Sequence, residues 1–437
     1  MENSNDFQVA FKTIRAKRPT LDLLNSYVEG GQPLRYSTKR LKEAFDKIDV
    51  RFEINWCSVV VDTTLDRLVL NGFDTEDKRA NDMLDAIFDR LHIDLEADKA
   101  HHAALSMTDA YIIVWKDGEN IEVYYNDPRM VHVFYDSAHP TVKSYAAKWF
   151  TRDDGKQQVT LYYTDRIEHY VSRGKKEINN EKDFELADTE QNTFGVIPVF
   201  QLKTRGEIVK ITSIQDAINK LFADMMVASE FGAFAQRYVI SNSDPGNLKN
   251  APNEIWWIPS GDGMGQGSSV GQFTSTDLKN YLDAMATLAS DIAIITRTPK
   301  HYLMNSGSNI SGEALLAMES PLVKKAEKHK RRFNAVWQDI AQFILQLDGI
   351  TVDATSIIPV WERVESIQPK TEAETRQVGF NTGIPLVTLL RREGWTEQEI
   401  MALEEDIAKE KENSRTLAQS VLDNLRIRDE QGEANGN

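Results

Sequence analysis

Two stretches of this sequence, ITSIQDAINKLFADMMVA (211–228) and LKNYLDAMATLASDIAII (278–295), decide how the chain is organised. Apolar residues recur in both stretches at alternating intervals of three and four. The first series is Ile211, Ile214, Ile218, Leu221, Met225 and Ala228, and the second is Leu278, Tyr281, Met285, Leu288, Ile292 and Ile295. A period of 3.5 residues gives a narrow apolar stripe, which is typical of helices that pack lengthwise against other helices.

Two kinds of packing satisfy these stripes. The helices can form a hairpin within one chain, or they can pack beside copies of themselves in a bundle or ring. Each predicted helix spans roughly 25 residues, or about 38 Å, and this length favours assembly. The segment 235–272 between them is rich in Pro, Gly and strand-like sequence, so we expect an elaborate tip at which a partner docks.

Composition limits the class of protein. The chain has 437 residues, 41% of them hydrophobic, a formal net charge of −16 and a single cysteine, Cys57. One cysteine excludes an internal disulfide and a cysteine metal cluster, and its apolar surroundings predict a buried thiol. No apolar run approaches membrane-spanning length and the N-terminus is charged, so we expect a soluble protein, without a membrane partner, made in a cytoplasm.

The negative charge is concentrated near the C-terminus. Residues 348–437 contain 18 acidic and 10 basic residues, which gives that segment a net charge of −8. Affinity for duplex DNA grows with the number of phosphates that Lys and Arg neutralise. Such an acidic chain should not grip nucleic acid, although it could surround DNA without holding it.

The remaining patterns predict an α+β fold. Residues 20–110 read as mostly helical, and a polar exposed loop is expected over 172–192 before the apolar run 194–200 returns to the sheet. A long helix, kinked at Pro321, is predicted over 312–347, followed by short helices to residue 428. An antiparallel meander is predicted by the runs 111–115, 121–125, 131–135, 145–150, 158–163 and 166–171.

The sequence contains no enzyme motif in the local structure that its chemistry requires. No phosphate-binding loop sequence is present, and the glycine run 261–271 lacks the spacing of a dinucleotide fingerprint. Residues 267–271 match GxSxG, so a serine hydrolase that uses Ser269 stays as an alternative, although a glycine tract stands where a strand is required. His101 and His102 are adjacent, cannot share a metal, and are expected at or near the surface. We predict no catalytic residue, metal or cofactor.

A basic cluster stands out in this acidic chain. Six basic residues fall within nine positions of the long helix: Lys324, Lys325, Lys328, Lys330, Arg331 and Arg332. One interpretation is a solvated face that pairs with Glu319, Glu327 and neighbouring subunits. The other is a ring of positive charge near a polyanion, weak at each contact but multiplied by symmetry.

The order of these parts resembles the portal proteins of long-tailed bacteriophages. The segment IAIITRTPKHYLMNSGSNISGEALLAMESPL (292–322) is similar to the family's stem helix, tunnel loop and long kinked helix. The segment 197–240 resembles the strand, first stem helix and start of the clip, with Lys203 and Thr204 where asparagine is common. Residues 381–400 resemble the crown helices, with Pro385 at a position often held by serine.

The resemblance implies a subunit with seven parts. They are a wing (1–206), stem helix 1 (207–234), a clip (235–272), stem helix 2 (273–298), a tunnel loop (299–311), a long kinked helix with the return to the wing (312–367), and an α-helical crown with a frayed tail (368–437). Copies would form a ring, typically of about twelve subunits, at one vertex of the capsid in the virion. Double-stranded DNA would pass through its channel, driven by a separate terminase.

The resemblance also suggests sites and partners. Tunnel-loop residues expected near DNA are His301, Tyr302, Asn305, Ser306, Ser308 and Asn309, with Lys324, Lys325 and Lys328 as weaker candidates. Trp256 and Trp257 in the clip are candidates for docking the terminase large subunit and then a head-completion adaptor, although core packing is equally open for them. Major capsid and scaffolding proteins are further expected partners. A capsid-associated adaptor without a DNA channel is the structural alternative.

Overall fold

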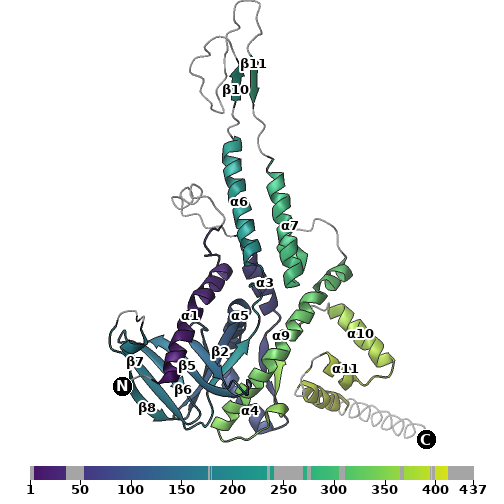
Figure 1. The fold of residues 1–437 in the computed structure, drawn as a ribbon. Helices are drawn as coiled ribbons and strands as arrows, with labels where there is room; N and C mark the ends of the chain where they lie inside the picture. Colours follow the sequence, from purple (N-terminus) through teal and green to yellow (C-terminus); the bar gives the residue numbers. More distant parts are fainter. Residues whose placement is uncertain are drawn as a thin grey trace, which may run out of the picture. The chain divides into compact units, whose positions relative to one another are not determined.

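The structure is a computed structural model. It describes residues 4–35, 54–175, 178, 180–233, 237–240, 269–272, 277–304, 311–364, 369–393, 395 and 399–411. The chain divides into two compact units, residues 1–364 and 365–437, which are described separately. Helices and strands are mixed throughout the first unit (Figure 1), which agrees with the α+β class expected from the sequence.

A five-stranded antiparallel sheet forms one part of the first unit. Its order is β4-β5-β6-β7-β8. The strands are β4 (Val131–Tyr135), β5 (Lys143–Thr151), β6 (Gln157–Tyr162), β7 (Arg166–Ser172) and β8 (Phe184–Gln191). Helix α1 (Asn5–Val28), capped by the Ser4 side chain, places Phe7, Phe11 and Ile14 in an apolar cluster with residues of this sheet. Burial of that aromatic-rich face holds the helix on the sheet.

A second, larger core surrounds a three-stranded sheet of order β3-β2-β9. Its strands are β2 (Asp109–Asp117), β3 (Asn120–Asn126) and β9 (Val199–Lys203). The helices that pack with it or with one another are α3 (Trp56–Leu65), α4 (Lys78–Leu91) and α5 (Ile93–Met107). Strand β1 (Leu70–Asp74) pairs with β12 (Ile358–Trp361), so the chain returns to this core after the long helix.

The predicted strands appear at their expected positions, but two expectations for this region are wrong. The meander divides between two sheets, and the polar segment 172–192 contains β8 rather than only a loop. All of β8 after Phe184 is exposed, so its sequence lacks the alternation that marks a half-buried strand, although its backbone pairs with β7. A strand at the edge of a sheet tolerates such polar sequence on both faces.

His101 also departs from the expectation of a surface position. It is fully buried, and its ring stacks on Phe333 at 4.8 Å and on Trp361 at 5.4 Å. Its Nδ1 lies 3.0 Å from the Leu68 carbonyl oxygen, and the Trp337 indole N–H donates to Nε2 at 3.0 Å. Burial lowers the pKa of His101 to about 3, so the ring is neutral and serves the core.

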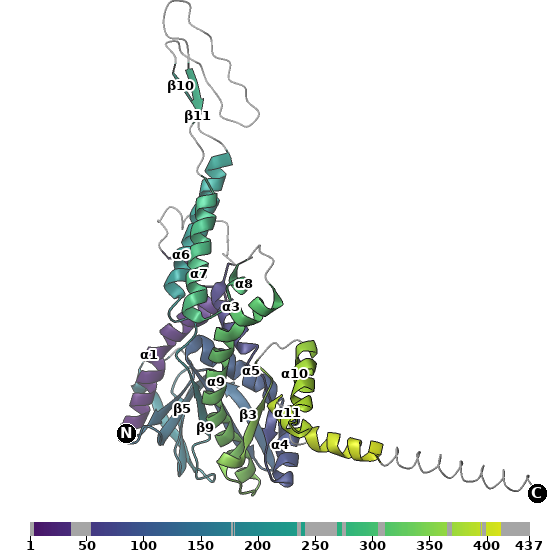
Figure 2. The ribbon, with the colours of Figure 1, turned by 90° about the vertical axis from the view of Figure 1, so that its right-hand side faces the viewer.

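The two striped helices are α6 (Thr212–Ala233) and α7 (Lys279–Thr296), which run side by side in both views (Figures 1 and 2). The stripe residues Ile211, Ile218, Met285 and Ile292 are buried in the large core cluster of the same chain. Ile214, Leu221, Met225 and Leu288 pack against that cluster. For the four buried residues the prediction of packing against other copies is therefore wrong, and the hairpin interpretation is correct. For the four partly buried residues, contact with another copy stays a prediction.

The buried face of α7 departs from the predicted stripe near the end of the helix. Met285, Ala289, Ile292, Ala293 and Thr296 are the buried positions, which follow the 3.6-residue period of a straight helix. Ile295 lies off this face and is 46% exposed. Beyond the helices, β10 (Arg237–Ile240) and β11 (Ser269–Gln272) pair as a short antiparallel ribbon.

The long helix α9 (Gly312–Leu347) begins and ends where the sequence predicted. Its N-cap is Ser311, whose side chain accepts from the Ala314 N–H, and the helix continues through Pro321. In the second unit, α10 (Pro369–Asn381), α11 (Leu386–Arg392) and a helical segment over 399–411 make up the described part of the predicted crown. Gly383 follows α10 with a φ of 95°, a conformation that favours glycine.

We predict that Trp337→Phe lowers the free energy of unfolding by about 2 kcal/mol, because the buried His101 Nε2 loses its donor. Trp337→Ala should cost about 3–5 kcal/mol, since it also opens a cavity. Denaturant unfolding followed by circular dichroism measures both. Val378→Ala, at a side chain that is 63% exposed, serves as the control and should change stability by less than about 0.5 kcal/mol. Equal stability of Trp337→Phe and the parent chain would contradict the assignment of this hydrogen bond.

Candidate functional site

The segment expected to lie near DNA is flanked by two anchored helices. Helix α8 (Lys300–Leu303) precedes it and α9 follows it. The Tyr302 hydroxyl donates to Glu319 Oε1 at 2.9 Å, and Arg67 Nη2 reaches Glu319 Oε2 at 3.0 Å and the Tyr302 hydroxyl at 3.3 Å. The Arg67 and Glu319 side chains are only 10% and 15% exposed. A shielded ion pair thus joins α8, α9 and the end of α3.

This geometry gives Tyr302 a structural contact, and its expected position near DNA stays a prediction. Its hydroxyl is engaged within the subunit, so it positions α8 against α9. His301, the neighbouring candidate, is half-buried, and among the residues that the structure describes its Nδ1 has no hydrogen-bond partner. The candidates Asn305, Ser306, Ser308 and Asn309 lie outside the described residues, as do Trp256 and Trp257 of the predicted clip.

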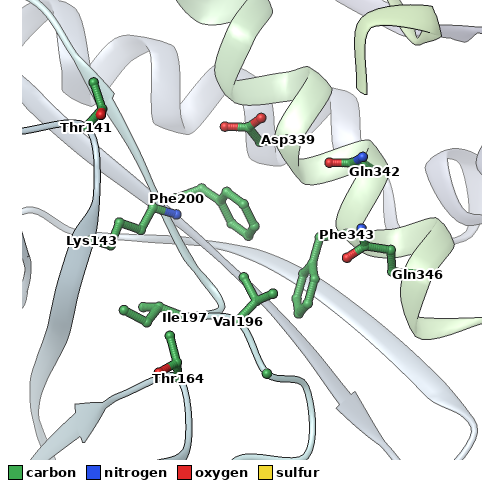
Figure 3. A pocket seen from close by; sticks show the side chains of 11 residues that line it. Thr141, Lys143, Thr164, Val196, Ile197, Phe200, Asp339, Gln342, Phe343 and Gln346 are labelled. Atoms are coloured by element: carbon green, nitrogen blue, oxygen red, sulfur yellow. The ribbon is translucent and has the colours of Figure 1, made fainter. Parts of the chain in front are cut away.

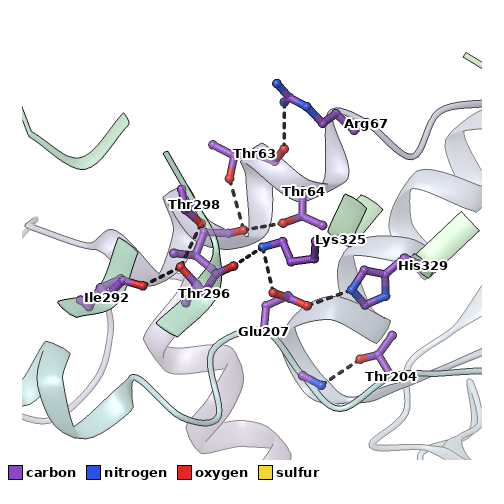
Figure 4. A network of polar contacts seen from close by, with 12 residues as sticks. Thr63, Thr64, Arg67, Thr204, Glu207, Ile292, Thr296, Thr298, Lys325 and His329 are labelled. Carbon is purple, nitrogen blue, oxygen red and sulfur yellow. Dashed lines mark hydrogen bonds and ion pairs between the residues drawn. The ribbon is translucent and has the colours of Figure 1, made fainter. Parts of the chain in front are cut away.

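The basic cluster on α9 divides into two classes of residue. Lys324, Lys328 and Arg331 are exposed, and in the part of the chain that the structure describes they make no ion pair. Lys325 points the other way and is only 7% exposed. The prediction of Lys325 as a lumen-facing DNA contact is therefore wrong, because its ammonium donates its hydrogen bonds within a buried network (Figure 4).

That network centres on Glu207, which lies between β9 and α6. Lys325 Nζ donates to Glu207 Oε2 at 2.9 Å and to the Thr296 carbonyl oxygen at 2.9 Å, and His329 Nε2 lies 2.9 Å from Glu207 Oε1. Three segments thus meet at the Lys325 ammonium on α9: the segment that precedes α6, through Glu207, and the end of α7, through the Thr296 carbonyl (Figure 4). Thr296 and Thr298 continue the polar contacts through a 3.0 Å hydroxyl pair.

The electrostatics of this site follow from its burial. Desolvation by itself would raise the pKa of Glu207, but the hydrogen bond from His329 and the charge of Lys325 outweigh it and lower the pKa to about 2. Desolvation also lowers the pKa of Lys325, and Glu207 opposes that change. The carboxylate is therefore ionised at neutral pH, and each charge depends on the other. Sequence reasoning missed Glu207, because nothing in its local pattern marks a buried acid.

A cavity of about 410 Å³ lies beside the C-terminal half of α9 (Figure 3). Phe200, Phe343 and Val196 supply apolar walls, and Lys143 and Asp339 supply charge. Lys143 Nζ donates to the Val199 carbonyl oxygen at 2.8 Å and lies 4.2 Å from the Phe200 ring centroid. Burial lowers the pKa of Lys143 to about 8. These contacts occupy the amine, and the side chains around it form no set of nucleophile, base and oxyanion donor.

Ser269, the candidate nucleophile of the hydrolase alternative, lies in the ribbon beyond α6 and α7. Ser269 begins β11, where its Cα pairs with Ile240, and residues 270–272 continue as strand. A nucleophile elbow needs a sharp turn between a strand and a helix, so this placement does not support the hydrolase alternative. Among the described residues, no group of His, Cys, Asp and Glu could hold a metal ion, and no helix is long and apolar enough to cross a membrane.

We predict that Glu207→Gln destabilises the first unit by about 3–5 kcal/mol, because it leaves the buried Lys325 ammonium without its counter-charge. Adding Lys325→Met should recover much of this loss. Lys210→Met, an exposed lysine three residues after Glu207, is the control and should be near neutral. Urea unfolding at pH 7 measures all three. Independent, additive effects of Glu207→Gln and Lys325→Met would contradict the pairing.

The same pair predicts a pH dependence. The folded-state pKa of Glu207 is about 2, below its ordinary value of 4.5. Its contribution to stability is therefore present above pH 4.5 and is lost as the pH falls toward 2. The stability difference between the parent chain and Glu207→Gln should shrink over that range.

Comparison with known proteins gives the chain a family. The family model for phage portal proteins of the SPP1 Gp6-like type matches residues 12–415. The portal protein of Mycobacterium phage L5 is 25% identical over 214 residues, which are 44% of this chain and 43% of that protein. The portal protein of Mycobacterium phage D29 is 27% identical over 121 residues, or 26% and 25% of the two chains. These alignments span less than half the length of either relative.

Solved structures of gene transfer agent particles also align with the chain. A chain from the virion of the native particle covers 82% of this chain and 94% of its own length, at 11% identity and a TM-score of 0.43. A chain from the neck of the empty particle covers 81% and 91%, at 11% identity and a TM-score of 0.45. Because these values are low, the assignment rests on the family model, which spans most of the sequence. The chain belongs to the SPP1 Gp6-like family of phage portal proteins.

Proposed function

We propose that this chain is the subunit of a ring at one vertex of a phage capsid, through which double-stranded DNA is packaged and ejected. Family membership carries the proposal. Portal proteins are structural rather than catalytic, which agrees with the absence of an enzyme motif in the sequence. A separate terminase large subunit would drive the DNA through the ring. The ring would dock that protein, and later a head-completion adaptor, through the clip around Trp256 and Trp257.

The tunnel loop is the element that we assign to DNA contact. Its proposed core, residues 305–310, is bracketed by the Tyr302–Glu319–Arg67 contacts, which hold its two flanking helices together. Rigid flanks would keep the ends of the loop at a constant distance while the loop itself meets the passing duplex. The net charge of −16 is suited to a channel that lets DNA pass without binding it tightly. Attractive contacts with the phosphates would have to be broken at every step of DNA movement.

Assembly requires a surface other than the buried stripes. Among the described side chains of α6 and α7, the exposed large apolar ones are Met226 (48% exposed), Leu282 (53%), Ile294 (66%) and Ile295 (46%). Water-exposed apolar side chains on paired stem helices favour burial between neighbouring subunits. We therefore assign these exposed side chains to contacts between copies of the chain.

Leu282→Glu combined with Ile294→Glu should abolish the ring and leave a folded monomer, because both side chains are exposed in the single chain. Native mass spectrometry and negative-stain imaging measure assembly, and circular dichroism measures folding. Asn280→Glu, an exposed position on the same helix, is the control and should still assemble. A monomer or dimer from the unaltered chain at high concentration would favour the adaptor without a channel.

Replacing residues 305–310 by a short Gly-Ser linker should leave ring assembly intact and reduce the yield of DNA-filled heads. The physical reason is that the anchoring contacts of Tyr302, Glu319 and Arg67 remain while the DNA-facing segment is lost. Nuclease-protected DNA per particle is the measurement. A normal yield of filled heads would remove the tunnel-loop assignment without affecting the ring.

A further inference from the structure

Three carboxylates form an exposed acidic patch where α3 ends beside α5. Asp62 lies in the last turn of α3, Asp66 is its C-cap, and Asp98 lies on α5, which packs against α3. All three are exposed, and within the described residues none of them makes an ion pair with Lys or Arg. The C-terminal end of a helix carries partial negative charge, so Asp62 and Asp66 are unfavourable for their own helix.

The carboxylates also act on one another. Desolvation raises the pKa of Asp62, with His102 opposing and Asp66 and Asp98 adding to the increase. Desolvation and Asp66 likewise raise the pKa of Asp98. A neighbouring apolar side chain, Leu95, lies one turn before Asp98 on α5 and is 55% exposed. The acidic patch, defined as Asp62, Asp66 and Asp98, therefore combines negative charge that pairs with no Lys or Arg of the described residues and an exposed apolar residue.

The complementary charge lies on α9. Lys324, Lys328 and Arg331 have the spacing i, i+4 and i+7, so they form a basic stripe on one face of the helix, over about 10 Å. The two nearest acids are already engaged, because Glu319 pairs with Arg67 and Glu327 lies 4.0 Å from Lys330. Within the described residues, no ion pair connects the basic stripe with the acidic patch of the same chain.

We propose that the basic stripe of one copy docks on the acidic patch of the next copy. The inference deepens the proposed function and rests on its ring. Each copy would present its stripe to one neighbour and its patch to the other, so the contact would be heterologous, the kind that generates closed rings when the rotation closes. Opposite charges would select the register between copies and speed their encounter. This use of Lys324 and Lys328 replaces their assignment to DNA and also relieves the repulsion among the three carboxylates.

A charge-reversal exchange tests the contact. Lys324→Glu with Lys328→Glu reverses the stripe, and Asp62→Lys with Asp66→Lys reverses the patch. Each variant alone should associate at least tenfold more weakly than the parent chain, whereas a mixture of the two should assemble in a one-to-one ratio, because every contact then joins opposite charges. Native mass spectrometry gives the stoichiometry, and sedimentation velocity at low and high salt gives the strength.

Folding is monitored separately. Lysine at the end of α3 suits the helix dipole, so Asp62→Lys with Asp66→Lys should keep or raise the Tm of the monomer. The matched control for the stripe is Lys175→Glu with Lys182→Glu, two exposed lysines and the same change in net charge, which should assemble as the parent chain does.

Two results would overturn the interface. One is a stripe variant that assembles normally but packages less DNA, which would favour the assignment of the stripe to DNA contact in the channel. The other is a failure of the mixed variants to associate although each is folded. A parent chain that forms no closed ring would contradict the proposed function, whereas one-to-one pairing of the mixed variants would still support the contact itself.

Discussion

The buried ion pair between Glu207 and Lys325 is the constraint on which the arrangement of the first unit depends. It joins the segment that leads into the first stem helix with the end of the second and the middle of the long helix. His329 completes the coordination of the carboxylate. Separating these three segments would leave a buried charge without its partner, which is strongly unfavourable.

A second ion pair acts in the same way closer to the proposed tunnel loop. Arg67, Glu319 and Tyr302 link α3, α8 and the first half of α9. Together, the two networks fix α9 along its length to the stem and to the large core, where Trp337 and Phe333 pack around His101. The loop that we assign to DNA therefore begins and ends on elements whose positions are set by shielded charges.

Surface charge has a different role in this account. The exposed lysines and arginine of α9 make no ion pair among the described residues, and the aspartates at the end of α3 repel one another. Buried charges specify the fold of one chain, whereas exposed charges that lack partners are suited to specify how chains meet. The exposed apolar side chains of α6 and α7 fit the same scheme, since the fold of one chain leaves them in contact with water.

The sequence by itself determined the class of fold, the positions of most strands, both stem helices and the limits of the long helix, because these depend on local periodicity and on caps such as Ser311. It also determined the family resemblance, through the order of segments along most of the chain. Only the tertiary structure decided which face of each helix is buried, that Lys325 and His101 are internal, and that residues 184–191 form an edge strand. These depend on contacts between residues distant in sequence, such as Glu207 with Lys325, and local patterns carry no record of such partners.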